Sequence, residues 1–477
     1  MKKKLVSILL SVAMTAALLA GCGSSAADTG AADSAAPAAE EAEDTGAADT
    51  AEAEETADTA DAAETAEAAE TAEAAEVDAS GDSGEIYMFI SSPEYADAIN
   101  ELIDEYAKVA PDVTINYETT QNDYPTLLKA KLNSGEVPDI FSSTSGKEID
   151  TYLEYSYDLS NEPIMTTMDP SVAAAMTSTE QGGKGCYGLA IKGNYFGILY
   201  NKDIFDEVGI TEFPETFDGL AEACDKIANA GYKPFTTGFA EWWVFKHTYQ
   251  SFVNAAADGA GISTADLVAK FEKGEAKVAD YPELYDNYFN FLDLAVKYGD
   301  AKPLETDLSS EEAAFANGEA AIMLGQGAWV EADCLAINPD LKIGFVGYPV
   351  TDDAAECKVI SGSDQALHVS KDSDNLQAVL NFVNWWYTSD YGKSWFTDVA
   401  GVVPPIVTDS PSDFEVIKQG SALAEEKGAG ALAICYSTDS WHQTCGQILQ
   451  SYIAGSVNKD EACAQIEEQW AAIDGAQ

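Results

Sequence analysis

The stretch "EIYMFISSPEYADAINELIDEYAKVAPDVTINYETT", residues 85–120, decides the fold class. It opens with an apolar and aromatic segment, "EIYMFIS", which is typical of a strand. The following segment carries Ile99, Leu102, Ile103 and Tyr106 at helical spacing and ends at Pro111. Apolar and polar residues then alternate in "DVTINYETT", which predicts a second strand.

The same alternation of strand and helix continues downstream. "YPTLLKAKLNSG" predicts a helix closed by Gly135, and "PDIFSS" predicts a short buried strand. Because strands that alternate with helices form parallel sheets with crossover helices, we expect an α/β protein. Further on, "YFGILYNKDIF" predicts a strand entering a helix, and Thr216 caps the helix of "TFDGLAEACDKIANAGY". Helical patterns dominate beyond about residue 280, interrupted by "AAIMLGQGAW", "IGFVGYP" and "QALHVS", which gives too many elements for one sheet.

The N-terminus has the composition of a secretory signal peptide. Three lysines at 2–4 precede an apolar run over residues 5–20, which is too short for a convincing membrane span. The ending "LAGC" resembles a bacterial lipobox, in which Cys22 becomes the lipidated first residue of the mature chain. Two acyl chains on Cys22 give stable membrane anchoring. The alternative is an ordinary signal cleaved near Ala20, with Cys22 incidental.

Residues 23–84 predict a disordered acidic linker. They consist almost entirely of Ala, Glu, Asp, Thr, Ser and Gly, with no basic residue. In "AAETAEAAETAEAAE" glutamates recur every third residue, which places like charges on one helix face. With almost no large apolar side chain this segment cannot bury a core, so we expect a flexible tether.

Charge and composition limit the classes of ligand. The formal net charge is −57, from 82 acidic and 25 basic residues, and electrostatic repulsion by such a chain argues against nucleic acid as a partner. All basic residues are lysine, and sites for phosphate, sulfate or carboxylates favour the bidentate arginine side chain. The sequence therefore favours a neutral or cationic ligand.

Besides Cys22 there are seven cysteines, which is an odd number, and no Cys-x-x-Cys motif occurs. We therefore expect buried thiols, with a pairing of Cys435 and Cys445 left open.

Enzyme motifs are lacking in the sequence. The three histidines are not at metal-ligand spacing, and neither a Gly-x-Ser-x-Gly elbow nor a Walker A loop occurs. One Gly-x-Gly-x-x-Gly match, "GKGCYG" at residues 183–188, follows a polar loop and precedes a strand, so it is interpreted as a turn. We therefore predict no catalytic residue, no metal and no cofactor.

The tryptophans provide the first indication of a binding site. Trp385 and Trp386 lie in a helical pattern, "LQAVLNFVNWWYTS", and are expected in the core. Other tryptophans stand in loop-like settings between small or polar residues, where a flat ring can stack on a sugar face or, alternatively, be buried by packing. These are Trp242, Trp243, Trp329 and Trp441.

Four segments together resemble the extracellular solute-binding proteins of ABC transporters, in particular the carbohydrate-binding family that includes maltose-binding protein. Residues 183–220 resemble the family's Gly-Lys-x-Tyr-Gly turn, its strand ending in Tyr-Asn-Lys, and its Pro-x-Thr-Trp/Phe helix start. Residues 135–143, 312–329 and 360–386 resemble its Pro-Asp-Ile segment, its Gly-x-Trp run and its return strand and helix. Ala190 departs from the family's usual proline.

The resemblance implies a two-lobe periplasmic-binding-protein fold of type II-like architecture, with a sheet flanked by helices in each lobe and a hinged ligand cleft between them.

The resemblance also implies positions for the binding residues. Trp329 matches the ring that stacks on sugar, Trp441 a C-terminal cleft aromatic, and Trp242 or Trp243 another cleft aromatic. Asp364 is the expected acceptor for ligand hydroxyls. Weaker candidates, whose alternative is ordinary loop polarity, are Asn194, Tyr195, Ser143, Thr144 and Tyr124.

These inferences combine into one hypothesis about the whole chain. It is a monomeric lipoprotein on the outer face of a bacterial cell membrane, which captures a sugar or oligosaccharide and delivers it to an ABC permease. The alternatives are a cationic ligand, such as a polyamine or quaternary ammonium compound, on the same fold, and, more remotely, a surface glycosidase. The predicted segments are a signal peptide at 1–21, lipidated Cys22 and linker at 22–84, lobe 1 at 85–190 and 362–403, and lobe 2 at 191–361 and 404–477.

Overall fold

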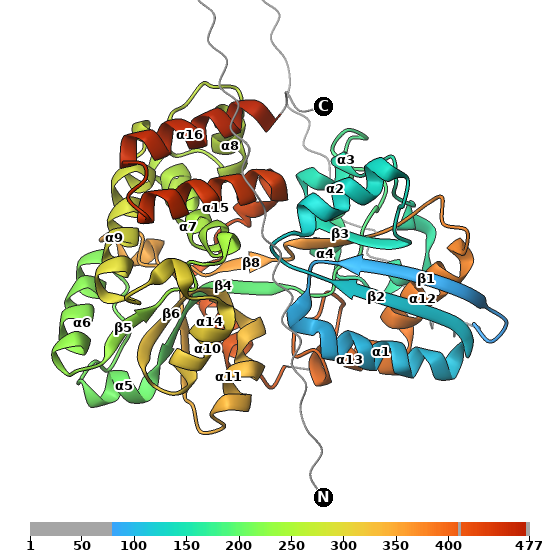
Figure 1. Cartoon of the computed structure of the whole chain (residues 1–477), viewed down its shortest axis with the longest axis horizontal. Helices are drawn as coiled ribbons and strands as arrows, with labels where there is room; N and C mark the ends of the chain where they lie inside the picture. The colour runs from blue at the N-terminus through green and yellow to red at the C-terminus, as the bar shows by residue number, and fades with distance from the viewer. Residues whose placement is uncertain (1–78, 409–411, 474–477) are drawn as a thin grey trace, which may run out of the picture. The chain divides into compact units, whose positions relative to one another are not determined.

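The computed structural model describes residues 79–408 and 412–473, which form two sheets flanked by helices (Figure 1). The predicted signal peptide, Cys22 and almost all of the predicted linker lie outside the described residues. Among the residues described, no helix has both the length and the apolar character that crossing a membrane requires.

The first sheet has the strand order β2-β1-β3-β9. Strand β1 (Ser83–Ile90) pairs in parallel with β2 (Asp112–Thr119) and with β3 (Ile140–Thr144). Helices α1 (Ala96–Val109) and α2 (Tyr124–Ser134) make the two crossovers, so the parallel arrangement predicted from the sequence is confirmed. Strand β9 (Gln365–Val369) returns late in the chain and pairs antiparallel with β3.

Alternation along β1 fixes which helix covers which face of the first sheet. Phe89 packs in a small cluster with Tyr124 and Leu128 of α2, whereas Met88 and Ile90 face the main core. On that second face, Tyr106 of α1 contacts Trp385, at 5.1 Å between ring centroids. Trp385 and Trp386 belong to α12 (Leu376–Thr388), which precedes α13 (Asp390–Asp398), and both are buried as predicted.

The second sheet has the strand order β5-β6-β4-β7, with β8 also paired to β4. Strand β4 (Asn194–Asn201) runs antiparallel to β6 (Ala320–Gly327), β7 (Ile343–Val346) and β8 (Ile360–Gly362), and β5 (Lys233–Thr236) runs parallel to β6. At Gly197, in the middle of β4, an added Cβ would lie 2.3 Å from the Val346 carbonyl oxygen, so close strand approach requires glycine there.

Local signals in the sequence set the helix starts beside β4. The Asn201 side chain accepts from the first backbone N–H groups of α5 (Lys202–Glu207). Thr216 accepts from Gly219 N and caps α6 (Phe217–Asn229), as predicted. The "GKGCYG" stretch has irregular backbone, with Gly183 at φ 73° and Gly185 at φ 76°, and the turn expected there lies just before it, at residues 179–182.

Helices surround the second sheet, and α7 is central among them because it packs against both β6 and α15. We name the first sheet with its helices lobe 1, and the second sheet with its helices lobe 2. The chain passes from lobe 1 into β4 through residues 190–193 and returns between β8 and β9. The remaining helices are α3 (Lys147–Thr151), α4 (Pro170–Ala175), α7 (Trp242–Ala260), α8 (Thr264–Glu272), α9 (Tyr288–Tyr298), α10 (Leu308–Ala316), α11 (Glu331–Ile337), α14 (Glu415–Lys427), α15 (Asp439–Ile453) and α16 (Lys459–Ala472).

The seven cysteines within the described residues are buried and unpaired. Cys435 and Cys445, whose pairing the sequence left open, do not form a disulfide; the Cys435 thiol instead lies 2.9 Å from the Ser145 hydroxyl. Burial raises the pKa of Cys435 to about 12, so this thiol is protonated and unreactive at neutral pH.

Candidate functional site

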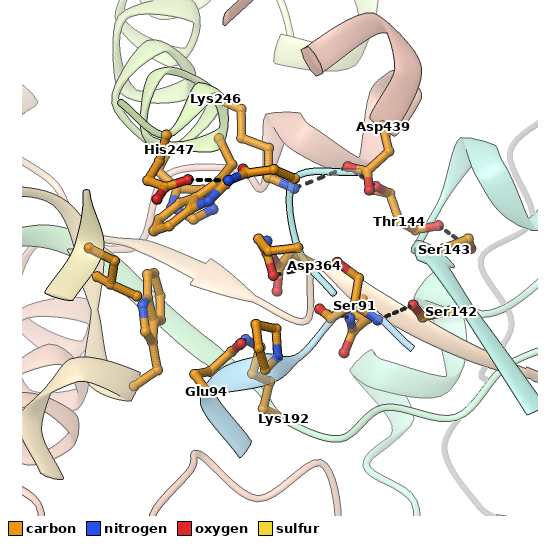
Figure 2. Close-up of a pocket in the computed structure, with 18 residues that line it drawn as sticks. Ser91, Glu94, Ser142, Ser143, Thr144, Lys192, Lys246, His247, Asp364 and Asp439 are labelled. Atoms are coloured by element: carbon orange, nitrogen blue, oxygen red, sulfur yellow. Dashed lines mark hydrogen bonds and ion pairs between the residues drawn. The ribbon is translucent and has the colours of Figure 1, made fainter. Parts of the chain in front are cut away.

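A cavity of about 180 Å³ opens where the first sheet's parallel strands end. In open α/β sheets, ligands bind outside the carboxyl ends of parallel strands, which is where this cavity lies. Lobe 2 closes it from the other side with the first turns of α7 and α15 (Figure 2). The lining residues are Ser91, Pro93, Glu94, Gln121, Asn122, Ser142, Ser143, Thr144, Lys192, Glu241, Trp243, Lys246, His247, Leu308, Trp329, Asp364, Gln365 and Asp439.

Tyr124 holds the strand ends of lobe 1 in place from behind the cavity. Its hydroxyl donates to the Ser142 carbonyl at 2.9 Å and accepts from Ser142 N at 2.7 Å. The Ser142 hydroxyl in turn accepts from Ser91 N at 2.9 Å, which ties β3 to the end of β1. Tyr124 is buried and does not line the cavity, so the structure places this predicted residue in a supporting position.

Ser143 faces the cavity as a hydrogen-bond acceptor. Because the Ser156 hydroxyl donates its proton to Tyr152 O, its oxygen accepts a hydrogen bond from His368 Nδ1, and these two atoms are 2.7 Å apart. The Ser143 hydroxyl lies 2.7 Å from the other ring nitrogen, Nε2, and 2.8 Å from Thr144 O, so its single proton serves one of these two acceptors. Burial lowers the pKa of His368 to about 3, so the imidazole is neutral. A base this weak does not activate a serine, and Ser143 instead offers its lone pairs to a ligand hydroxyl.

Asp364 is the charged centre of the cavity. It accepts a hydrogen bond from Asn194 Nδ2 at 3.0 Å, while Asn194 itself lies behind it, outside the lining. Burial by itself raises the pKa of the Asp364 carboxyl, but the positive charges of Lys192 and Lys246 lower it by a larger amount. The pKa of Asp364 therefore lies below its ordinary value. The carboxylate is therefore ionised between two ammonium groups, which Figure 2 shows on opposite sides of it.

Each lysine of the cavity has its own carboxylate partner. Lys192 Nζ lies 2.9 Å from Glu94, and Lys246 Nζ lies 3.2 Å from Asp439. Both lysine side chains are only 8% exposed. The two ammonium groups thus offset part of the charge of the four carboxylates in the lining, which are Glu94, Glu241, Asp364 and Asp439.

Trp329 is fixed by a chain of hydrogen bonds. It lies in a short 3-10 helix, η7 (Ala328–Val330), and its Nε1 donates to Gln326 Oε1 at 3.0 Å. Gln326 Nε2 donates to the buried Glu311 carboxyl at 2.7 Å. The ring also packs edge-on against Phe196 and His247, at 5.6 and 5.3 Å between centroids. This support leaves the indole in a single orientation at the edge of the cavity.

The expected loop settings of the tryptophans are wrong, because these residues begin helices. Trp242 and Trp243 are the first two residues of α7, and Trp441 stands in the first turn of α15, where Thr438 Oγ1 accepts from its backbone N–H. Trp243 lines the cavity together with Trp329. Trp242 lies outside the lining, and Trp441 is buried against Trp470 at 3.8 Å between ring centroids.

The other predicted residues divide between the lining and its surroundings. Thr144 lines the cavity and donates to Asp439 at 3.1 Å. Tyr195 packs against α14, where a Cβ on Gly420 would lie 2.5 Å from its ring, and does not reach the lining. Lys192 and Lys246 were not singled out from the sequence, although a lysine inside the apolar run "LAIKGNYFGILY" was an available signal.

Hydrogen bonds link the lobes at the rim of the cavity. Asn122 of lobe 1 donates to Glu241 at 2.6 Å and accepts at its carbonyl from Gln443 at 2.9 Å. Deeper in, the fully buried Glu148 of α3 accepts from Asp439 N at 2.8 Å. Burial and the neighbouring Asp439 raise the pKa of Glu148 to about 8. Within the described residues no cluster of three or more His, Cys, Asp or Glu side chains could hold a metal ion.

The fold and this inter-lobe cavity define a two-lobe binding protein. A sequence profile described as the bacterial extracellular solute-binding protein matches residues 90–393. The chain belongs to this family of bacterial extracellular solute-binding proteins.

Several proteins similar to this chain have names that refer to sugars. The melibiose/raffinose/stachyose-binding protein MelE of Bacillus subtilis (strain 168) is 23% identical over 307 residues, which cover 62% of this chain and 68% of that protein. The multiple sugar-binding protein of Streptococcus mutans serotype c is 23% identical over 325 residues, covering 67% and 74%. Among solved structures, a chitin oligosaccharide binding protein superposes with a TM-score of 0.71 at 19% identity, covering 83% of this chain and all of that one.

Proposed function

We propose that this protein captures a sugar or oligosaccharide outside the cell and delivers it unchanged to the permease of an ABC importer. The observation that carries the proposal is the rigidly held Trp329 ring in the same cavity lining as Asp364. An aromatic face suits the apolar face of a sugar ring, while carboxylates and hydroxyls such as Asp364 and Ser143 accept from its hydroxyl groups. Family membership and the sugar-binding relatives support the same ligand class.

The proposal includes the place where the protein works. Lipidation at Cys22 would anchor the chain to the outer face of the membrane, and residues 22–84 would let the binding lobes move near the permease. The protein would act as a monomer and without catalysis. Support for the absence of catalysis comes from the site, where His368 is too weak a base to activate Ser143.

Isothermal titration calorimetry against melibiose, raffinose, stachyose and chitin oligosaccharides tests the proposal. The decisive variant is Trp329→Ala, with Trp470→Ala as its matched control. Both tryptophans are buried, and each substitution costs about 3–5 kcal/mol of stability, but Trp470 lies away from the cavity. We expect sugar binding to survive Trp470→Ala and to be lost or at least tenfold weaker in Trp329→Ala. The proposal is wrong if no carbohydrate binds, or if both variants bind it equally well.

A further inference from the structure

The ammonium group of Lys192 lies in an aromatic cage built by both lobes. Its Nζ is 4.9 Å from the centroid of the Tyr95 ring and 5.3 Å from that of Trp329. Tyr95 and Glu94 come from a short 3-10 helix of lobe 1, η1 (Pro93–Tyr95), whereas Trp329 comes from lobe 2. The Glu94 carboxylate, 2.9 Å from Nζ, completes the cage, and the charge of Asp364 acts on Lys192 as well.

These are the groups that bind a cationic ligand in other proteins. A cation within about 6 Å of an aromatic centroid is attracted by the ring quadrupole, and the attraction grows when the site is desolvated. Here the cage is desolvated, since the lysine side chain is 8% exposed and that of Glu94 is 14% exposed. The cavity thus contains a complete cation site that the protein's own side chain fills.

Lys246 repeats the arrangement on the other side of Asp364. Its Nζ lies 5.6 Å from the Trp242 ring and 3.2 Å from Asp439. An incoming cation would meet two buried ammonium groups, and to take either position it would have to displace a lysine from its carboxylate. An incoming anion would meet the four carboxylates of the lining, Glu94, Glu241, Asp364 and Asp439. An uncharged ligand meets neither penalty.

We infer that Lys192 is a specificity-determining residue, whose ammonium occupies the cation position of the cavity so that cationic solutes are excluded and an uncharged ligand is admitted. This inference rests on the proposed function, because it names the charge class of the ligand at the same site. It also assigns two carboxylates of the lining a role, because Glu94 and Asp439 hold the two lysines in place.

Removal of the Lys192 side chain tests this inference directly. Lys192→Ala leaves the cage of Tyr95, Trp329 and Glu94 empty, and the probe is tetramethylammonium chloride, compared with sodium chloride at the same ionic strength. We expect tetramethylammonium to raise the unfolding midpoint of Lys192→Ala saturably and to bind it at least tenfold more tightly than the wild type. Lys302→Ala, at an exposed lysine paired with Glu305, should behave like the wild type. Adding Trp329→Ala to Lys192→Ala should abolish the effect.

Two outcomes overturn the inference. One is a folded Lys192→Ala that responds equally to both salts; the other is a wild-type protein that tetramethylammonium stabilises saturably, with a dissociation constant below about 1 mM, relative to sodium chloride at the same ionic strength. The wild-type titration keeps the inference open to refutation even if Lys192→Ala does not fold. A sugar titration of the wild type separates this inference from the proposed function. If sugar binds and Lys192→Ala gains no cation site, only this inference fails; if the cation site appears and no sugar binds, the proposed sugar function fails.

Discussion

Gln326 connects the cavity tryptophan to a buried carboxyl, and its replacement by methionine tests whether this connection holds the ring. Methionine fills similar space without hydrogen-bonding groups of comparable strength. The substitution leaves Trp329 Nε1 and one oxygen of Glu311 without their partners, at sites where the protein now makes bonds of 3.0 and 2.7 Å. Each buried polar atom left unsatisfied costs about 1–3 kcal/mol, so we expect a loss of about 2–6 kcal/mol in the free energy of unfolding.

Urea denaturation followed by circular dichroism measures this loss, and a double-mutant cycle isolates the bond itself. Trp329→Phe removes the donor to Gln326 together with part of the ring system, and the double variant Gln326→Met/Trp329→Phe removes both partners of that bond. We expect the double variant to lose at least about 1 kcal/mol less than the sum of the single losses. Gln377→Met, at an exposed position of α12 that bonds only its neighbour Asn381, serves as the control and should change stability by less than about 0.5 kcal/mol.

Two results would refute this reasoning. In the first, Gln326→Met loses no more stability than Gln377→Met, which would mean that the buried atoms find other partners. In the second, the single losses add up in the double variant, which would mean that the Gln326–Trp329 bond contributes nothing. If the chain does orient the ring, Gln326→Met also weakens sugar binding without touching the ligand, and calorimetry on the folded variant would detect it.

Three further predictions follow from the charges and thiols of the site. Asp364→Asn removes a charged acceptor, so sugar binding should weaken about tenfold to a hundredfold in calorimetry, and an unchanged dissociation constant would contradict the assigned role. Burial and the neighbouring Lys246 lower the pKa of His247 to about 3, so the unfolded chain takes up a proton near pH 6.5 that the folded protein does not. Stability should therefore fall as the pH drops from about 6.5 toward 3, by up to about 1.4 kcal/mol per pH unit from this residue, and urea titrations of His247→Gln should show a shallower fall. The seven buried cysteines should resist a thiol reagent in the native protein and react on unfolding, as mass spectrometry of the labelled peptides can establish; rapid native labelling at any of them would contradict the burial found here.

Local signals predicted most of the fold. The helical spacing that ends at Pro111, the alternation in "DVTINYETT" and the Thr216 cap act over a few residues, so they could be recognised in the chain alone. The same holds for the core positions of Trp385 and Trp386, which follow from their place in a helical pattern. The late return of β9 to pair with β3 was predicted only through the resemblance to a family, because strand pairing across more than 200 residues leaves no local trace.

The cavity was predicted less completely, because its members meet only through tertiary contacts. The sequence singled out aromatic rings that suit a sugar, the resemblance to the family added Asp364 as an acceptor for its hydroxyls, and the absence of arginine favoured a neutral or cationic ligand. It did not distinguish Trp329, which borders the cavity, from Trp441, which is buried against another tryptophan from a helix near the C-terminus. The position of Lys192 between two rings from different lobes was likewise decided by the tertiary structure. Residue type fixed what each side chain can bind, but the packing of the two lobes determined which side chains face one another.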